Sequence, residues 1–149
     1  EVRGAAHPNS GYRHEITHTL QMAEDLPNAL QPILDGIPQA FDLTDELYLA
    51  PVFEGDVIPL IRSSHTFTED GFYSATLALQ GQMFSREGWS HPQGSNLVGW
   101  VKRAQNSPLV YLQPGDGPDT YANPHYRKLV ENAIRWAASD GAKEWARSA

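Results

Sequence analysis

The chain has 149 residues, 40% of them hydrophobic and 10% aromatic, which predicts one folded domain with a single buried core. Its net charge is -7, from 18 acidic and 11 basic residues, and the basic residues are scattered, so nucleic acid is not an expected partner. It contains no cysteine, which excludes disulfides and thiol catalysis within these residues. It also has no apolar run long enough to cross a membrane and no signal-peptide pattern, so we expect a cytoplasmic location without a membrane partner.

The first patterned segment, residues 13–22, fits either a strand or a helix. Ile16, Leu20 and Met22 alternate loosely, as on a strand, while Ile16 and Leu20 also share one face of a helix. The β-branched Thr17 weakens the helical interpretation. A turn at 24–28 and a short irregular or helical piece at 29–34 follow.

Residues 14–18 read His-Glu-Ile-Thr-His and match the zinc-protease motif, in which two histidines one helical turn apart bind the metal and the glutamate activates water. The motif needs a helix and a third ligand. On a strand the same spacing places His14 and His18 on one face, which permits a divalent metal pair without the protease geometry. A zinc metalloprotease therefore enters as an alternative, as does a metal site that draws on the six histidines.

Residues 41–49 have the period-two pattern of a strand. The apolar odd positions are Phe41, Leu43, Leu47 and Leu49. Glu46 and Tyr48 share the other face. Asp45 interrupts the apolar face, and its carboxylate must be hydrogen-bonded there, either in a functional role or by capping neighbouring backbone N–H groups.

The middle of the chain is less clearly patterned. Residues 57–61 form an apolar, β-branched run that predicts a strand ending near Arg62. Residues 72–83 fit a helix or a pair of strands equally well. Trp100 and Val101 indicate a further strand before the turn at 106–108.

The C-terminal third predicts a strand, a turn and a helix in succession. Residues 109–112 are an apolar run typical of a buried strand, and the turn at 113–117 places Asp116 at its carboxyl end. A helix is expected from Pro124, with Asn123 as its cap. Its apolar stripe contains Tyr126, Leu129, Val130, Ala133, Ile134 and Ala137. Residues 143–148 form a weakly helical tail.

Ligands of open α/β sheets collect outside the carboxyl ends of the strands. By position alone, this rule makes Asp116, Tyr121, Asn123 and His125 site candidates. The competing interpretation is that these residues serve the turn and the helix cap.

Three blocks, in this order, carry a resemblance to a known family. They are Pro-Ile-Leu-Asp-Gly-Ile-Pro at 32–38, Asp-Glu-Leu-Tyr at 45–48, and the C-terminal strand followed by Tyr-Ala-Asn-Pro and a helix that contains Ile-Arg-Trp-Ala. Together they resemble the ThuA-like family, named for trehalose utilisation. Gln31 and Asp116 stand where the family often has a histidine.

The resemblance implies an α/β fold with a flavodoxin-like layered sheet, similar to class I glutamine amidotransferases. Family domains are longer, so residues 1–149 are expected to be the C-terminal portion of one such domain, incomplete at its N-terminus. The implied function is carbohydrate catabolism on a disaccharide or an oxidised sugar derivative, with a small-molecule sugar as the partner.

Glu46 and Asp116 are the predicted catalytic pair of a sugar-processing hydrolase or lyase, because paired carboxylates suit acid and base roles in glycoside cleavage. Aromatic and polar side chains near loops are the predicted sugar contacts. The predicted substrate-binding residues are Tyr48, Trp89, His91, Tyr121 and Asn123. For Tyr111 and Trp136 we expect core packing instead.

A second class of function is a non-catalytic sugar-binding or accessory module, since the cysteine nucleophile of the related fold is missing and two family histidines are replaced. An unpaired sheet edge would also favour a homo-oligomer.

Overall fold

The structure of the protein is a computed structural model, and it describes residues 10–148. One six-stranded sheet runs in the order β2-β1-β3-β5-β6, with the short β4 paired to β1. The strands are β1 (Gly11–Met22), β2 (Ala40–Leu49), β3 (Ile58–Ser63), β4 (Tyr73–Ser74), β5 (Leu97–Ala104) and β6 (Ser107–Leu112). All of their pairings are antiparallel.

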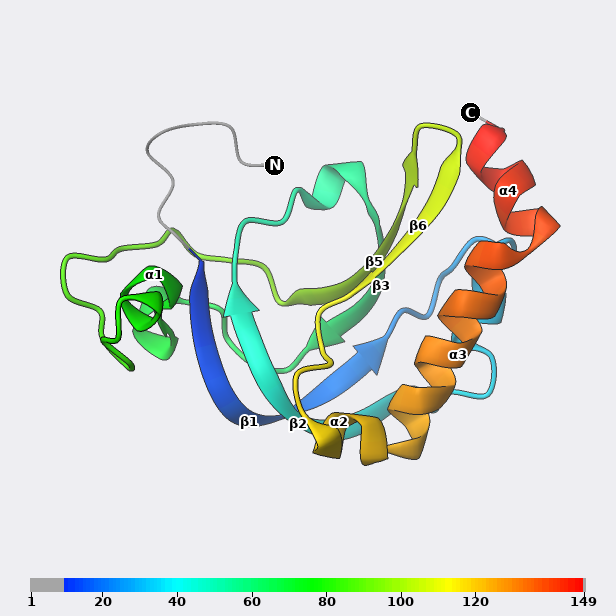
Figure 1. The fold of residues 1–149 in the computed structure, drawn as a ribbon. Coiled ribbons are helices and arrows are strands. Elements are labelled where there is room, and N and C mark those ends of the chain that lie inside the picture. The colour runs from blue at the N-terminus through cyan, green and yellow to red at the C-terminus, as the bar shows by residue number, and fades with distance from the viewer. Residues whose placement is uncertain (1–9, 149) are drawn as a thin grey trace.

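Four α-helices and three 3₁₀ turns complete the described part. The helices are α1 (Ala75–Leu79), α2 (Pro118–Ala122), α3 (Pro124–Ala138) and α4 (Asp140–Arg147). The turns are η1 (Gln31–Leu34), η2 (Glu54–Asp56) and η3 (Glu69–Gly71). Figure 1 shows a strongly curled sheet with α3 and α4 along one side and α1 at the opposite end. None of the helices within 10–148 has the length and apolarity to cross a membrane.

The mixed α/β class is confirmed, but the flavodoxin-like layering is not what residues 10–148 show. A parallel sheet needs long crossovers, usually helical, between successive strands. Here the only α-helix between strands in the described part is α1, which has five residues, and the longer helices all follow the last strand. The segment at 13–22 is a strand, and residues 72–83 contain both β4 and α1.

The hydrophobic core lies between the curled sheet and α3. Leu20 of β1 and Leu129 of α3 are fully buried, and Trp136 is 4% exposed, as expected for a core residue. The Trp136 indole N–H donates to the Ala29 carbonyl at 2.6 Å. Asn132 donates to the carbonyl of Asp35 at 2.8 Å, so the helix is tied to the segment around η1 by polar as well as apolar contacts.

A bulge in β1 decides which way its side chains point. The register with β2 shifts between Arg13 and Ile16, and Glu15 has a φ of 53°, the left-handed conformation that an extra residue in a strand often adopts. Before the bulge, His14 lies on the side of Glu46, and after it, His18 lies opposite Leu43 on the buried side.

The two faces of this part of the sheet therefore have distinct roles. We call the side of β2 that carries Leu43 and Leu47 the core face, and the side that carries Glu46 and Tyr48 the pocket face. The alternation predicted for residues 41–49 is confirmed, with Asp45 at 5% exposed among the apolar residues of the core face.

The free edge of β2 is covered by side chains of the segment that follows β6. The Gln113 amide bonds to both backbone groups of Tyr48, at 3.1 Å to its N–H and 3.2 Å to its carbonyl. Farther along, Thr120 donates to the Thr44 carbonyl. Curling of the sheet thus brings the end of β6 against β2, and the edge of β2 is occupied here rather than open for pairing.

Candidate functional site

Asp45 fixes the loop that follows β6. One carboxylate oxygen accepts the N–H of Glu46 at 2.9 Å and that of Asp116 at 3.2 Å, and the other accepts the N–H of Gly115 at 2.5 Å. The capping role that the sequence leaves open for Asp45 is therefore the one that its contacts show. Because the carboxylate is buried, these three donors hold a loop 70 residues away in sequence at one place on β2.

Gly115 allows this close approach. Its φ is 138°, and a Cβ atom there would lie 2.9 Å from the Tyr121 hydroxyl and 3.0 Å from the Tyr126 hydroxyl. Tyr126 donates its own hydroxyl to the Pro114 carbonyl at 2.5 Å, and burial raises the pKa of Tyr126, so the phenol stays a donor. The loop is thus held from two sides.

Three side chains on the pocket face, His14, Glu46 and Tyr48, form a contacting trio with Glu46 in the middle. His14 Nδ1 lies 3.3 Å from one oxygen of Glu46, and the Tyr48 hydroxyl donates to the other. Glu46 is 9% exposed, whereas the His14 side chain is 40% exposed. Burial, the hydrogen bond to Glu46 and the nearby carboxylates raise the pKa of Tyr48 well above its ordinary value, which keeps its phenol protonated.

Two of the three, His14 and Glu46, border a pocket of about 240 Å³ between β2 and the loop that Asp45 holds, whereas Tyr48 is not part of its lining. The lining residues are His14, Glu15, Thr44, Asp45, Glu46, Asp116, Gly117, Pro118 and Asp119. The structure thus brings Glu46 and Asp116, the predicted catalytic pair, to one pocket from positions 70 residues apart. Its volume lies below the roughly 300–1,000 Å³ of pockets for drug-sized ligands, so it suits a smaller ligand.

A comparison with protein-family models identifies the family to which this chain belongs. The family model ThuA, described as trehalose utilisation, matches residues 3–137 and so nearly the whole chain. The chain belongs to the ThuA family. Membership connects it with carbohydrate metabolism in general, and the pocket falls entirely inside the matched residues. A search of curated proteins finds no match.

The two positions at which the chain departs from the ThuA pattern lie in different places. Gln31 is exposed on η1 and donates to the Leu26 carbonyl and the Asn28 side chain, away from the pocket. Asp116 lines the pocket. Only the second departure therefore changes the chemistry of the pocket.

Trp89 and His91 do not line this pocket. Trp89 packs against the core beside Gly11, where an added Cβ would lie 3.0 Å from its indole ring. His91 is 6% exposed; its N–H donates to Glu69 at 2.8 Å, and its Nδ1 lies 2.7 Å from the Pro92 carbonyl. The structure gives both residues a role in holding their loop on the sheet.

Tyr121 and Asn123 lie beyond the loop on the helical side. Tyr121 is 48% exposed and packs edge-on against Tyr126. The Asn123 side chain accepts the N–H groups of His125 and Tyr126, so it is the predicted cap of α3, and it also donates to the Asp42 carbonyl. The contacts of these two residues of the ThuA motif are those of residues that form a turn and cap a helix.

The metal pair predicted for His14 and His18 is wrong, because the bulge at Glu15 places the two rings on opposite faces of the sheet. His18 is 3% exposed, and its Nδ1 lies 2.7 Å from the Ser63 hydroxyl. The motif lies on a strand, so the helical geometry of a zinc protease does not form. Residues 10–148 hold no cluster of three or more metal-binding side chains.

Several residues of the site are not predicted from the sequence. Gln113 follows the last strand and has no pattern that signals its bond to β2. Thr44 and Asp119 line the pocket. Asp119 follows the same strand end as Asp116, so the positional rule that predicts Asp116 applies to Asp119 as well.

Proposed function

We propose that the pocket bordered by His14, Glu46 and Asp116 is the sugar-binding and acid/base site of a carbohydrate-processing enzyme. The observation that carries the proposal is the placement of two carboxylates, Glu46 and Asp116, in one small pocket of a ThuA family member. The substrate class we propose is a disaccharide or an oxidised sugar derivative, which is finer than the family assignment.

Glu46 is the group we assign to proton transfer. One of its oxygens accepts from the Tyr48 phenol, and the other lies beside the His14 imidazole, so its carboxylate is oriented on both sides. Asp116 stands in the place of a family histidine and supplies a second carboxylate to the pocket. In the proposed acid/base pair, one of the two carboxyl groups donates the proton and the other accepts it. In this assignment His14 and Tyr48 are positioning residues.

Removing the carboxylate charge at either position tests the proposal. We expect Glu46→Gln and Asp116→Asn each to lower turnover of a sugar substrate about a hundredfold, since a positioned acid or base contributes about that much or more. Candidate substrates are trehalose and its oxidised derivatives, and product formation is followed by chromatography. Folding is checked by circular dichroism, and Glu131→Gln, on the exposed surface of α3, is the matched control.

Full turnover in both pocket variants would contradict the assignment of these carboxylates. The alternative function, a non-catalytic sugar-binding module, is favoured by the replacement of the family histidine at Asp116. Titration calorimetry separates the two functions: heat of binding with no product after long incubation supports the module, whereas product formation supports the enzyme.

A further inference from the structure

Glu46, the residue assigned to proton transfer, is nearly enclosed although it lines the pocket. Its side chain is 9% exposed. One carboxylate oxygen accepts the Tyr48 phenol, and the other lies 3.3 Å from Nδ1 of His14. A sugar in the pocket would cover the part of Glu46 that the pocket leaves open. While a sugar is bound, a proton that replaces the one Glu46 gives away must therefore come through one of these two partners.

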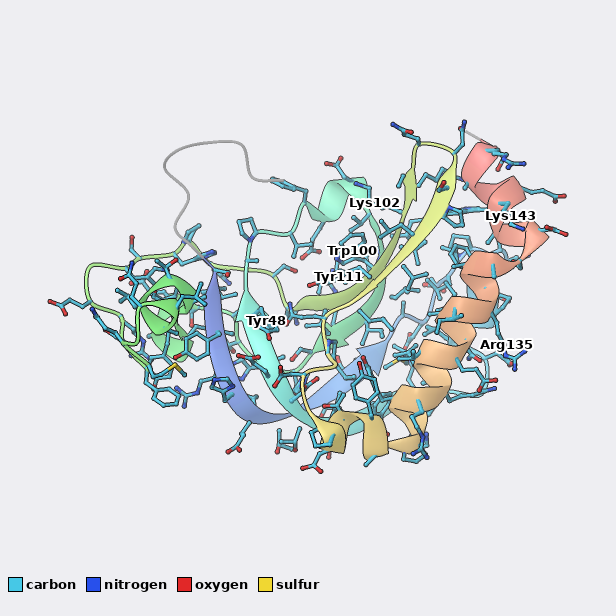
Figure 2. The ribbon with its side chains drawn as sticks, viewed as in Figure 1. Tyr48, Trp100, Lys102, Tyr111, Arg135 and Lys143 are labelled. Atoms are coloured by element: carbon cyan, nitrogen blue, oxygen red, sulfur yellow. The ribbon has the colours of Figure 1, made fainter. Side chains whose placement is uncertain are left out.

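Tyr48 is not the route for this proton. Burial, the hydrogen bond to Glu46 and the nearby carboxylates raise the pKa of Tyr48 well above its ordinary value, so its phenol keeps its proton. Tyr48 lies on β2 beside the segment that follows β6, to which the Gln113 amide bonds its backbone (Figure 2). The phenol is thus fixed as a donor to Glu46.

His14 has the exposure and the chemistry that a proton relay needs. Its side chain is 40% exposed, more than four times the fraction of Glu46. Imidazole gains and loses a proton between pH 5 and 8 and can carry it on either ring nitrogen. Nδ1 of His14 faces Glu46, and no side chain or backbone group among residues 10–148 bonds to Nε2, which leaves Nε2 available to water. The contact of 3.3 Å is long, but contacts of this kind often tighten when substrate binds.

Two aromatic rings hold the His14 imidazole at Glu46. The Tyr12 ring lies 5.0 Å from the imidazole at an angle of 65°, and the Phe84 ring lies 6.1 Å from it at 78°. Phe84 has a φ of 58°, which is rare for a bulky residue, and its N–H donates to the Tyr12 hydroxyl at 2.9 Å. The hydroxyl of Tyr12 thus stabilises this strained conformation, while its ring packs against His14. Strained residues of this kind cluster at functional sites.

We propose that His14 relays protons from solvent to Glu46 during turnover. The proposal rests on the proposed function of the pocket, and His14 acts through Glu46 without needing to contact the sugar. As the glycosidic bond breaks, Glu46 gives its proton to the leaving oxygen. The attacking water gives its hydroxyl to the anomeric carbon and its proton to Asp116, which later releases that proton to solvent.

The relay then restores Glu46. Nε2 of His14 takes a proton from solvent, and Nδ1 of the resulting imidazolium passes its proton to Glu46. Exchange with solvent returns the imidazole to its starting tautomer. One water is consumed for each bond broken, and the enzyme ends the cycle with the protons that it had at the start.

Two substitutions separate a relay from a residue that only orients Glu46. His14→Gln keeps an N–H donor for Glu46 but cannot titrate, and His14→Ala keeps neither property. We expect both variants to lower kcat on trehalose or its oxidised derivative roughly tenfold and to change KM less, because water is a poorer proton donor than imidazolium. Imidazole added to the buffer should restore most of the lost kcat. His125→Gln, on the exposed surface of α3, is the matched control.

The outcomes distinguish the relay from the pocket assignment. Wild-type turnover in His14→Gln, whatever the rate of His14→Ala, would overturn the relay, since orientation alone would then be sufficient. Slow variants that added imidazole does not accelerate would overturn it as well. In both cases a slow Glu46→Gln variant would leave the pocket assignment in place. A wild type that forms no product from either sugar would overturn the enzymatic function and the relay with it.

Discussion

Replacing Asp45 with alanine should destabilise the protein by roughly 3–5 kcal/mol. The substitution leaves three backbone N–H groups without their acceptor, and a buried donor that loses a charged partner costs about 1–3 kcal/mol. Asp45→Asn should cost less, because one amide oxygen still accepts. The free energy of unfolding, measured by urea denaturation, should follow the order wild type, Asn, Ala.

The same variant should also open the pocket, because Asp45 is what holds Gly115 and Asp116 against β2. Hydrogen exchange of peptides that cover residues 113–119 is expected to accelerate in Asp45→Ala more than exchange of β3. Asp42→Ala is the matched control, since the carboxylate of this exposed aspartate on the same strand accepts the Thr19 hydroxyl and does not touch the loop at 113–119 in the hydrogen bonds of the described residues. If the two alanine variants were equally stable, Asp45 would not be the clamp described here.

Acidification should destabilise the protein through His18. Burial, together with the neighbouring His65, lowers the pKa of His18 from 6.5 to about 4, against opposing effects of Asp45 and Asp42. Between these two pKa values the unfolded chain binds a proton that the folded chain does not. The contribution of His18 to the free energy of unfolding is therefore fully present above pH 6.5. It decreases as the pH falls, by roughly 3 kcal/mol at pH 4.

His18→Asn tests this origin of the acid sensitivity. The asparagine retains a polar atom near the position of Nδ1, which lies 2.7 Å from the Ser63 hydroxyl. Between pH 7 and pH 4, the free energy of unfolding, measured by urea denaturation, should fall by roughly 3 kcal/mol less in this variant than in the wild type. His125→Asn, at an exposed histidine of α3, is the control. An unchanged decline in His18→Asn would assign the effect to other groups.

Two elements of the fold can be predicted from local sequence patterns alone. Period two at residues 41–49 and the cap and stripe of residues 123–138 are local signals, because burial of one strand face or one helix stripe repeats at a fixed interval. Both elements are where the sequence places them. The flavodoxin-like arrangement was inferred from family likeness, and strand direction depends on connections that periodicity does not encode.

The candidate site shows where local pattern fails. A single extra residue at Glu15 reverses the alternation of β1, so His14 and His18, four residues apart, lie on opposite faces. Tyr111 has the neighbours of a buried residue, yet its own side chain is 38% exposed and stacks on Trp100.

By itself, the sequence determined the family, the mixed α/β class, the strand at β2, the helix at α3 and the choice of Glu46 and Asp116 as paired carboxylates. The tertiary structure decided which of the candidate residues share a pocket. That selection depends on contacts between residues about 70 positions apart, above all the bonds from Asp45 to the loop at Gly115. Such contacts arise from the curl of the sheet and the bulge in β1, which no short-range periodicity specifies.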